Sequence, residues 1–205
     1  MSLYSYVVRY DSGFAPNPFY GYCTLATCKP GIRNAAQIGD WVVGCGSAAR
    51  GVNLGGRLVY SMRITEILST AAYWQGARFT KKRPMRRGSR KQSCGDNIYY
   101  PTDDGWGQLD SFHSRPDGTP DPQHIARDTG TNRILVSTDY AYFGGDAPKF
   151  PAALRDFNGT DVCKSGIGLK KLEDPELIEH FEAWVGTLGT GLCGFPQEWM
   201  SLRDK

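Results

Sequence analysis

Cys28 and Lys29 are the neighbouring side chains with the clearest potential for covalent chemistry. The thiolate is the reactive form of cysteine and a neighbouring cation favours it, so Cys28 is a candidate nucleophile. No histidine lies close to Cys28 in the sequence to act as its base, which favours a plain buried cysteine instead. The other candidates for acid or base chemistry are Asp11, Asp96 and His113.

A polar stretch over residues 101–132 contains two of the three histidines together with several aspartates. These residues are His113 and His124, with Asp103, Asp104, Asp110, Asp117, Asp121 and Asp128. Such side chains could bind a metal ion or transfer protons. Their spacing matches no known ligand pattern, so we expect neither a metal nor a cofactor. Long irregular stretches of this kind are usually functional or mobile.

Positive charge is concentrated in residues 78–91, which read RFTKKRPMRRGSRK. This segment holds eight basic and no acidic residues, whereas the rest of the chain has 16 basic against 21 acidic residues. Basic side chains in a loop can follow a phosphate backbone and release its condensed counterions, so the segment predicts contact with a polyanion. The alternative is a solvated loop, which is what most charge runs are.

Two further motifs have competing interpretations. Residues 44–49, GCGSAA, resemble the glycine loop that binds dinucleotides, but no helix is expected after them, so a turn is favoured. Phe14, Phe19, Tyr20 and Tyr22 lie in or beside a proline-rich loop and could stack on bases, although packing within the protein is the favoured role.

Hydrophobic patterning predicts short strands and a few helices. Strands are expected over 3–10, 41–46, 57–65, 97–100 and 133–144, and helices over 31–38, over 66–74 and from Pro175 after an Asp174 cap. The last helix carries one buried stripe of Leu177, Ile178, Phe181, Trp184 and Val185, and its His180 is expected to be structural. Without a strand–helix–strand rhythm, we expect an α+β fold with a small mixed β-barrel of about five to seven short strands, peripheral helices and a C-terminal amphipathic helix.

The 205 residues suit one domain, with 101–132 as its long irregular loop, and no linker divides them. The N-terminus lacks the pattern of a secretory signal, and no apolar run approaches the roughly 20 residues of a membrane span. We therefore expect a cytoplasmic protein with no membrane partner, whose six cysteines are reduced thiols.

Several long motifs resemble one protein family. They are YDSGFAPNPFYGYCTLATCKPGIRNAAQIGDWVVGCGS (10–47), LVYSMRITEIL with YW (58–74), CGDNIYY (94–100) and ILVSTDYAYFG (134–144). Together they resemble the nucleotide modification associated domain, type 2, of bacteria and phages, over nearly the whole chain. GDWVVG followed by YSMRITEIL also resembles, more weakly, the barrels of EVE, ASCH and PUA-type domains, which hold a modified or flipped base.

The resemblance implies a base pocket and a phosphate-binding surface. The base pocket would comprise Asp11, Asn17, Phe19, Tyr20, Thr24, Asp96 and Asn97. By the same resemblance, Lys29 and Arg33 would contact phosphate. The charge of the basic segment adds the other expected phosphate contacts, which are Lys81, Lys82, Arg83, Arg86, Arg87, Arg90 and Lys91.

These observations favour a module that binds nucleic acid or a nucleotide, recognising a modified base in DNA rather than RNA. One alternative is an enzyme that modifies or hydrolyses a nucleotide or base, with the 101–132 stretch closing over the substrate. Another is a protein–protein adaptor in a DNA-modification or defence system. We make no prediction of the oligomeric state.

Overall fold

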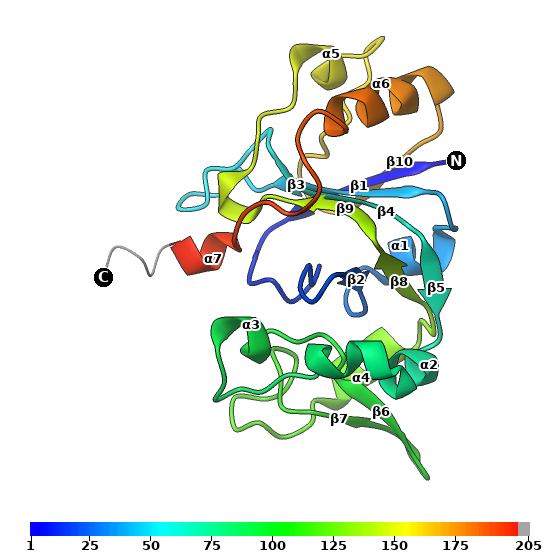
Figure 1. Ribbon diagram of the computed structural model, residues 1–205, viewed down its shortest axis with the longest axis vertical. Helices are drawn as coiled ribbons and strands as arrows, with labels where there is room; N and C mark the ends of the chain where they lie inside the picture. The colour runs from blue at the N-terminus through cyan, green and yellow to red at the C-terminus, as the bar shows by residue number, and fades with distance from the viewer. Residues whose placement is uncertain (201–205) are drawn as a thin grey trace. The chain divides into compact units, whose positions relative to one another are not determined.

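The computed structural model describes residues 1–200 and divides the chain into two compact units (Figure 1). Unit 1 comprises Met1–Ser12, Ala36–Thr65 and the chain from Ser137 onward, and unit 2 comprises Gly13–Ala35 and Glu66–Val136. Each unit is built from separate stretches of the chain, so no linker in the sequence marks a boundary. The expectation of a single domain over 1–205 stays a prediction.

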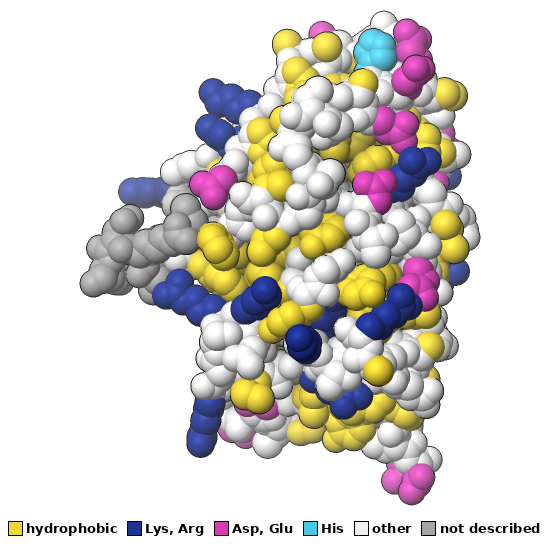
Figure 2. Space-filling view, in the orientation of Figure 1, with side chains coloured by type: hydrophobic (Ala, Val, Ile, Leu, Met, Phe, Trp, Pro, Cys, Tyr) yellow, Lys and Arg dark blue, Asp and Glu magenta, His cyan; other side chains and the backbone are white. Residues whose placement is uncertain are grey.

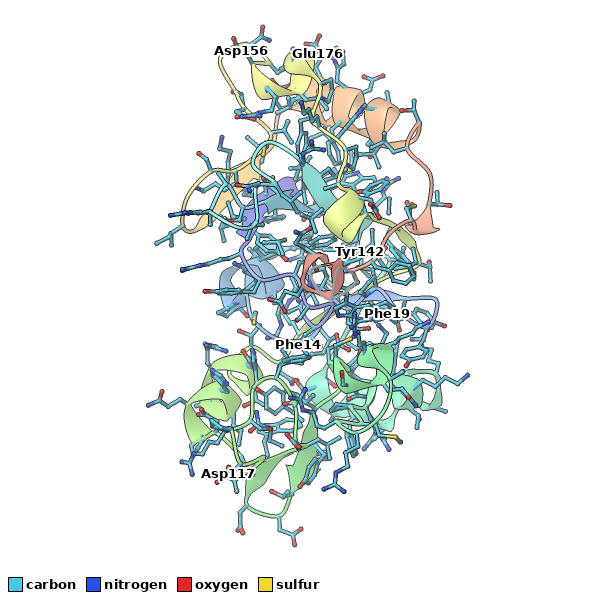
Figure 3. The ribbon with its side chains drawn as sticks, turned by 90° about the vertical axis from the view of Figure 1, so that its left-hand side faces the viewer. Phe14, Phe19, Asp117, Tyr142, Asp156 and Glu176 are labelled. Atoms are coloured by element: carbon cyan, nitrogen blue, oxygen red, sulfur yellow. The ribbon has the colours of Figure 1, made fainter. Side chains whose placement is uncertain are left out.

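Unit 1 is organised around a six-stranded mixed sheet in the order β10-β1-β3-β4-β9-β11. Its strands are β1 (Leu3–Val8), β3 (Trp41–Gly46), β4 (Leu58–Arg63), β9 (Asp139–Tyr142), β10 (Leu169–Leu172) and β11 (Gly191–Leu192). β1 pairs with β3 in parallel and β9 with β11 in parallel, while the other neighbours are antiparallel. Tyr142 is fully buried among the side chains that fill this unit (Figure 3).

The prediction of a β-barrel is wrong. Within residues 1–200, the strands form open sheets of six, three and two strands, and β10 and β11 are edges that do not pair with each other. The number of short strands was sufficient for a barrel, but strand count does not determine whether the hydrogen-bond ladder closes. The α+β class and the peripheral helices remain.

Unit 1 also contains several short helices and one longer helix. They are η2 (Gly144–Asp146), α5 (Ala152–Arg155), α6 (Pro175–Val185) and α7 (Gln197–Met200). The Asp174 side chain accepts from two backbone N–H groups and caps α6, as its sequence predicted. Phe181 of α6 packs edge-on against Trp41 of β3, with ring centroids 5.5 Å apart. Figure 1 shows α5 and α6 on the same side of the sheet.

Unit 2 contains a three-stranded sheet, a hairpin and several short helices. The sheet has the order β2-β8-β5, from β2 (Cys23–Leu25), β8 (Ile134–Ser137) and β5 (Glu66–Leu68), and the hairpin joins β6 (Tyr99–Thr102) to β7 (Gly105–Gln108). The helices are α1 (Pro30–Ala35), α2 (Thr70–Gln75), η1 (Ala77–Lys82), α3 (Arg90–Ser93) and α4 (Pro122–Thr129). Tyr73, Phe79 and Val136 belong to its buried hydrophobic cluster.

Several predicted elements divide differently in the structure. Residues 66–74 form β5 and then α2, because Ser69 caps the helix and ends the strand. Residues 133–144 form two strands, β8 and β9, which join different sheets. The stretch 101–132 is less irregular than expected, since it contains β7 and α4. The basic segment overlaps the helices η1 and α3, and a capping box at Ser89 stabilises the start of α3.

The glycines of residues 44–46 serve packing inside β3. A Cβ on Gly44 would lie 2.3 Å from Cε1 of Tyr60, and one on Gly46 would lie 2.2 Å from the Leu54 carbonyl oxygen. These residues therefore form a strand where neighbouring groups approach the backbone closely.

Within residues 1–200, none of the helices has both the length and the apolar character needed to cross a bilayer.

Candidate functional site

Cys28 lies in unit 2, in the tight turn between β2 and α1. The turn gives Cys28 a φ of 59° and Lys29 a φ of 43°, which is the left-handed region that non-glycine residues rarely occupy. The Lys29 carbonyl then accepts from the N–H groups of Ile32 and Arg33 as α1 begins. Both Cys28 and Lys29 remain partly exposed. Strained backbone of this kind is often found at functional sites.

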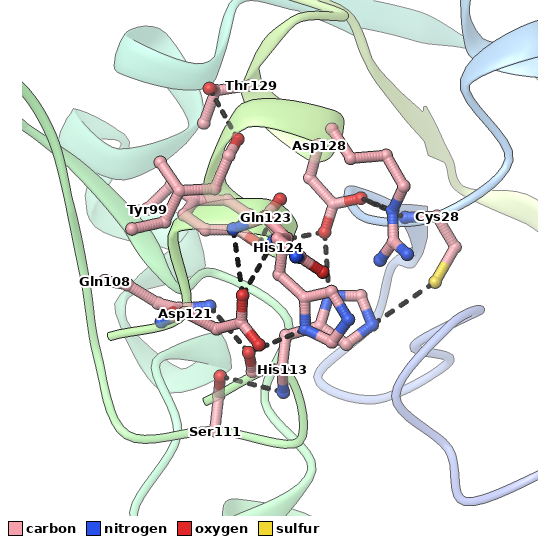
Figure 4. Close-up of polar contacts among 12 residues, drawn as sticks. Cys28, Tyr99, Gln108, Ser111, His113, Asp121, Gln123, His124, Asp128 and Thr129 are labelled. Carbon is pink, nitrogen blue, oxygen red and sulfur yellow. Dashed lines mark hydrogen bonds and ion pairs between the residues drawn. The ribbon is translucent and has the colours of Figure 1, made fainter. Parts of the chain in front are cut away.

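His113 and Asp128 complete a hydrogen-bonded array with Cys28 (Figure 4). The Cys28 Sγ lies 3.4 Å from Nε2 of His113, and Nδ1 of His113 lies 2.7 Å from Oδ2 of Asp128. His113 follows β7, and Asp128 is in the last turn of α4. A nucleophile, a base and a group that orients the base are the parts of a catalytic triad.

The Asp128 carboxylate is fixed from several directions. Its Oδ1 accepts from the Cys28 backbone N–H at 3.1 Å and from Arg127 Nε at 3.2 Å. Its Oδ2 also accepts from the Tyr99 hydroxyl at 2.8 Å. Asp128 therefore holds the backbone of Cys28 as well as the ring of His113, which fixes their relative positions.

The ion pair shifts the pKa values of its members in opposite directions. Burial alone would lower the pKa of His113, but hydrogen bonds to Asp128 and Cys28 outweigh it and raise the pKa to about 9. Burial would raise the pKa of Asp128, but the hydrogen bond and charge of His113 lower it to about 2. At neutral pH the imidazole is therefore protonated and the carboxylate ionised.

Neighbouring groups hold the His113 ring and backbone. The Phe14 ring packs edge-on against the His113 ring, with ring centroids 4.8 Å apart. The centroid of the His124 ring lies 4.3 Å from that of His113. The His113 carbonyl accepts from Gln108 Nε2 and lies 2.7 Å from His124 Nδ1. Next to Cys28 in the chain, the buried hydroxyl of Thr27 has no hydrogen-bond partner. An unsatisfied buried group is uncommon and requires an explanation such as a bound ligand.

Two of the predicted phosphate-binding cations are buried. Arg33 donates to the carbonyls of Arg133, Asp128 and Thr131, and its side chain has no exposed surface. Lys82 is likewise unexposed, and Nζ donates to Asn17, to the Tyr22 carbonyl and to Thr24. Both cations hold unit 2 together and have no surface to offer a phosphate.

Most of the predicted base-binding residues form the interior of unit 2. Asp96 accepts from the hydroxyls of Thr24 and Tyr73, and burial raises its pKa. The Asn97 side chain donates to the carbonyls of Tyr73 and Phe79. Phe14 and Phe19 come from the loop before β2 (Figure 3), and Phe19 is 1% exposed. Tyr20 is partly exposed.

Asp11 belongs to unit 1, where its carboxylate accepts from the Tyr142 hydroxyl and from the backbone N–H of Gln197. It is therefore engaged in packing within that unit.

The remaining predicted cations provide exposed charge on unit 2. Lys81, Arg86, Arg87 and Arg90 are exposed, and Arg83 and Lys91 are partly exposed. Arg86 lies over the Phe112 ring at 4.6 Å, and Lys91 lies over the Tyr20 ring at 4.9 Å. Arg86 also pairs with Asp110 at 3.7 Å. Where α2 and α3 lie, Figure 2 shows Lys and Arg side chains interspersed with hydrophobic ones.

Sequence reasoning named Cys28 and His113 as candidates but did not pair them. They are 85 residues apart, and Asp128 is 100 residues from Cys28. Asp128 was only one of the acidic residues of the polar stretch, and no spacing distinguished it. Within residues 1–200, no three His, Cys, Asp or Glu side chains are arranged to hold a metal ion.

The fold is α+β, and its unit 2 brings Cys28, His113 and Asp128 into hydrogen-bond contact. Such an arrangement is a candidate active site of a thiol-dependent protein. The chain belongs to the nucleotide modification associated domain 2 family, whose model matches residues 1–203. This confirms the family indicated by the sequence motifs and links the chain to nucleotide modification. No curated protein and no solved structure matches the chain.

Proposed function

We propose that the protein is a cysteine-dependent enzyme that modifies or hydrolyses a nucleotide or a base in nucleic acid. The observation that carries this proposal is the contact of Cys28 with His113, which is in turn oriented by Asp128. A protonated imidazole beside a cysteine stabilises the thiolate, which is the nucleophilic form. The family to which the chain belongs supplies the substrate class.

The proposed reaction begins with the thiolate of Cys28 and the imidazolium of His113. Sγ attacks an electrophilic carbon of the substrate, a C–S bond forms, and the bond from that carbon to the leaving group breaks. The leaving group takes the proton from Nε2 of His113. A water molecule then gives a proton to His113 while its oxygen attacks the same carbon, and the C–S bond breaks to restore the thiolate. An acceptor amine or hydroxyl in place of water gives group transfer instead.

The exposed cations of unit 2 support a phosphate-bearing substrate. Arg86 lies over Phe112, the residue that precedes His113 in the chain, and Arg87 and Arg90 are exposed nearby in sequence. A substrate whose phosphates contact this surface would be held without contacting the buried Lys82 and Arg33.

The test is mass spectrometry of substrates and protein after incubation and acid quench. The substrates are mixed nucleotides and oligonucleotides that carry modified bases. We expect altered substrate or an added mass on Cys28 with the wild-type protein, and neither with Cys28→Ala. The exposed Cys193 provides the matched control, so Cys193→Ala should behave as the wild type. Equal turnover by Cys28→Ala would contradict the proposal.

A second candidate function is recognition of a modified base in DNA without catalysis. The observation that favours it is the contact of cations with aromatic rings at the surface, in which Lys91 lies over Tyr20 and Arg86 over Phe112. Aromatic rings can stack on bases while neighbouring cations contact phosphates. This second proposal includes a preference for DNA over RNA.

Binding of fluorescent oligonucleotides at several salt concentrations tests the second function. Arg87→Gln combined with Arg90→Gln should weaken binding by about tenfold and reduce its salt dependence, because binding of the variant releases fewer counterions from the phosphates. Arg50→Gln, an exposed arginine of unit 1, is the control and should bind as the wild type. Affinity that is independent of salt and of these cations would contradict it.

A further inference from the structure

A cavity lies within unit 1, on the sheet face near the C-terminal end of α6. Its volume is about 240 Å³, and the residues that define its chemistry are Trp41, Ser61, Arg63, Asp139, Glu182 and Val185. All of them belong to unit 1 and none to the Cys28 site. The proposed enzyme mechanism uses none of these residues.

The strand register explains why the polar residues meet there. Ser61 and Arg63 are two positions apart in β4, so their side chains point to the same face of the sheet. Arg63 is paired with Trp41 on β3 and with Asp139 on β9, which places these side chains beside it. Glu182 and Val185 come from α6, which packs on this face through Phe181 and Trp41.

Ser61 provides the independent sign of a ligand. The residue is 0% exposed and lines the cavity, yet its hydroxyl has no hydrogen-bond partner. A buried hydroxyl without a partner has lost its hydrogen bonds to water and has no protein hydrogen bond to replace them, so it destabilises the fold. A ligand with a polar atom at the floor of the cavity would satisfy it.

The rim of the cavity offers both acceptors and a donor. Glu182 accepts from the Trp41 indole N–H at 2.8 Å through Oε1, which fixes its carboxylate. Asp139 adds a second, exposed carboxylate, and the exposed guanidinium of Arg63 supplies N–H donors, with a 3.9 Å contact to the Met1 sulfur. One cation against two carboxylates gives the rim a net negative charge, which disfavours a phosphate.

We propose that this cavity binds an uncharged nucleobase or nucleoside with an amino group and a carbonyl on its ring. The carboxylates of Asp139 and Glu182 accept from the amino group, Arg63 donates to the carbonyl, and Ser61 bonds a polar atom at the floor. The volume is below the roughly 300 Å³ at which pockets for larger ligands begin, so it suits one base rather than a dinucleotide.

The test measures calorimetric binding of cytidine, guanosine, adenosine, thymidine and glucose to the full chain. Cytidine or guanosine, which carry both groups, should bind about tenfold more tightly than adenosine, which lacks the carbonyl, or thymidine, which lacks the amino group. Arg63→Gln should weaken this binding by about tenfold, and Arg50→Gln should leave it unchanged. Cys28→Ala should also bind normally, so this test is independent of the enzyme proposal.

Ser61→Ala separates a ligand role from a structural one. We expect it to weaken binding at least about threefold while its melting temperature does not fall, because the variant loses an unsatisfied buried group. Failure of all four nucleosides to bind, preference for glucose, or binding unaffected by both Ser61→Ala and Arg63→Gln would overturn the proposal.

Discussion

At the scale of single residues, the candidate site of unit 2 depends on the hydrogen bonds that His113 makes with Asp128 and Cys28. Asp128 lies 2.7 Å from Nδ1, which keeps Nε2 directed at Cys28. The same carboxylate accepts the backbone N–H of Cys28, so loss of Asp128 would disturb both partners. In the proposed enzyme, Asp128 is therefore a positioning residue, and Cys28 and His113 are the candidate catalytic residues.

The ion pair makes stability depend on pH. The pKa of His113 rises from 6.5 to about 9 on folding, so its contribution is complete below pH 6.5 and is lost as pH rises through 9. The pKa of Asp128 falls from 3.8 to about 2, so its contribution is complete above pH 3.8 and is lost as pH falls through 2. Both shifts arise from the same ion pair, so their free energies are not summed. The pair stabilises the folded state by about 2 to 3 kcal/mol.

We expect the free energy of unfolding in urea to fall by about 2 kcal/mol between roughly pH 6.5 and pH 9.5 in the wild type. His113→Gln should remove most of this fall, because the glutamine has no proton to lose. His180→Gln, which changes an exposed histidine of unit 1, should retain the wild-type dependence. A His113→Gln protein with the same pH dependence as the wild type would show that the pair does not stabilise the fold.

At the scale of elements, close packing explains glycines that resemble a nucleotide-binding loop. Gly44→Ala would place a Cβ 2.3 Å from Tyr60 Cε1 and 2.7 Å from Val8 Cγ2. Because both neighbours are buried in the core of unit 1, we expect this variant to lose about 1 to 3 kcal/mol in urea unfolding. Gly186→Ala is the control, since the α6 cap has a φ of −58° and should change stability by less than about 1 kcal/mol. Equal stability of both variants would contradict this packing role.

Some elements could be predicted from the sequence, and others could not. The alternation in residues 57–65 and the cap at Asp174 correctly located β4 and α6, because both signals are local. The apolar spacing of residues 66–74 fits a single helix, so it does not indicate the short strand β5 that begins this stretch. Ser69 was the available signal, because a serine at that point caps α2 and ends the strand.

At the scale of the whole molecule, sequence reasoning failed where distant segments pair. β1 pairs with β10 on one side and with β3 on the other, and no local pattern specifies this order or prevents a barrel from closing. The long motifs nevertheless indicated the correct family, because such a match uses many positions at once.

The basic segment over 78–91 offers less positive charge to a partner than its sequence suggests. The basic segment over 78–91 loses Lys82 to the interior of unit 2 and part of its charge to ion pairs such as Arg78 with Glu66. The cations that remain exposed are the ones available to a phosphate. Counting charge along the sequence therefore overestimated the binding surface, since it could not distinguish buried cations from exposed ones.

The reactivity of Cys28 tests the central claim most directly. The measurement is the rate of alkylation by iodoacetamide at about pH 6, followed by peptide mass spectrometry, with the exposed Cys193 as the internal reference. The account predicts that Cys28 reacts at least about tenfold faster than Cys193, and that His113→Gln removes this advantage without changing Cys193. Equal rates at the two cysteines, or a Cys28 rate unaffected by His113→Gln, would contradict it.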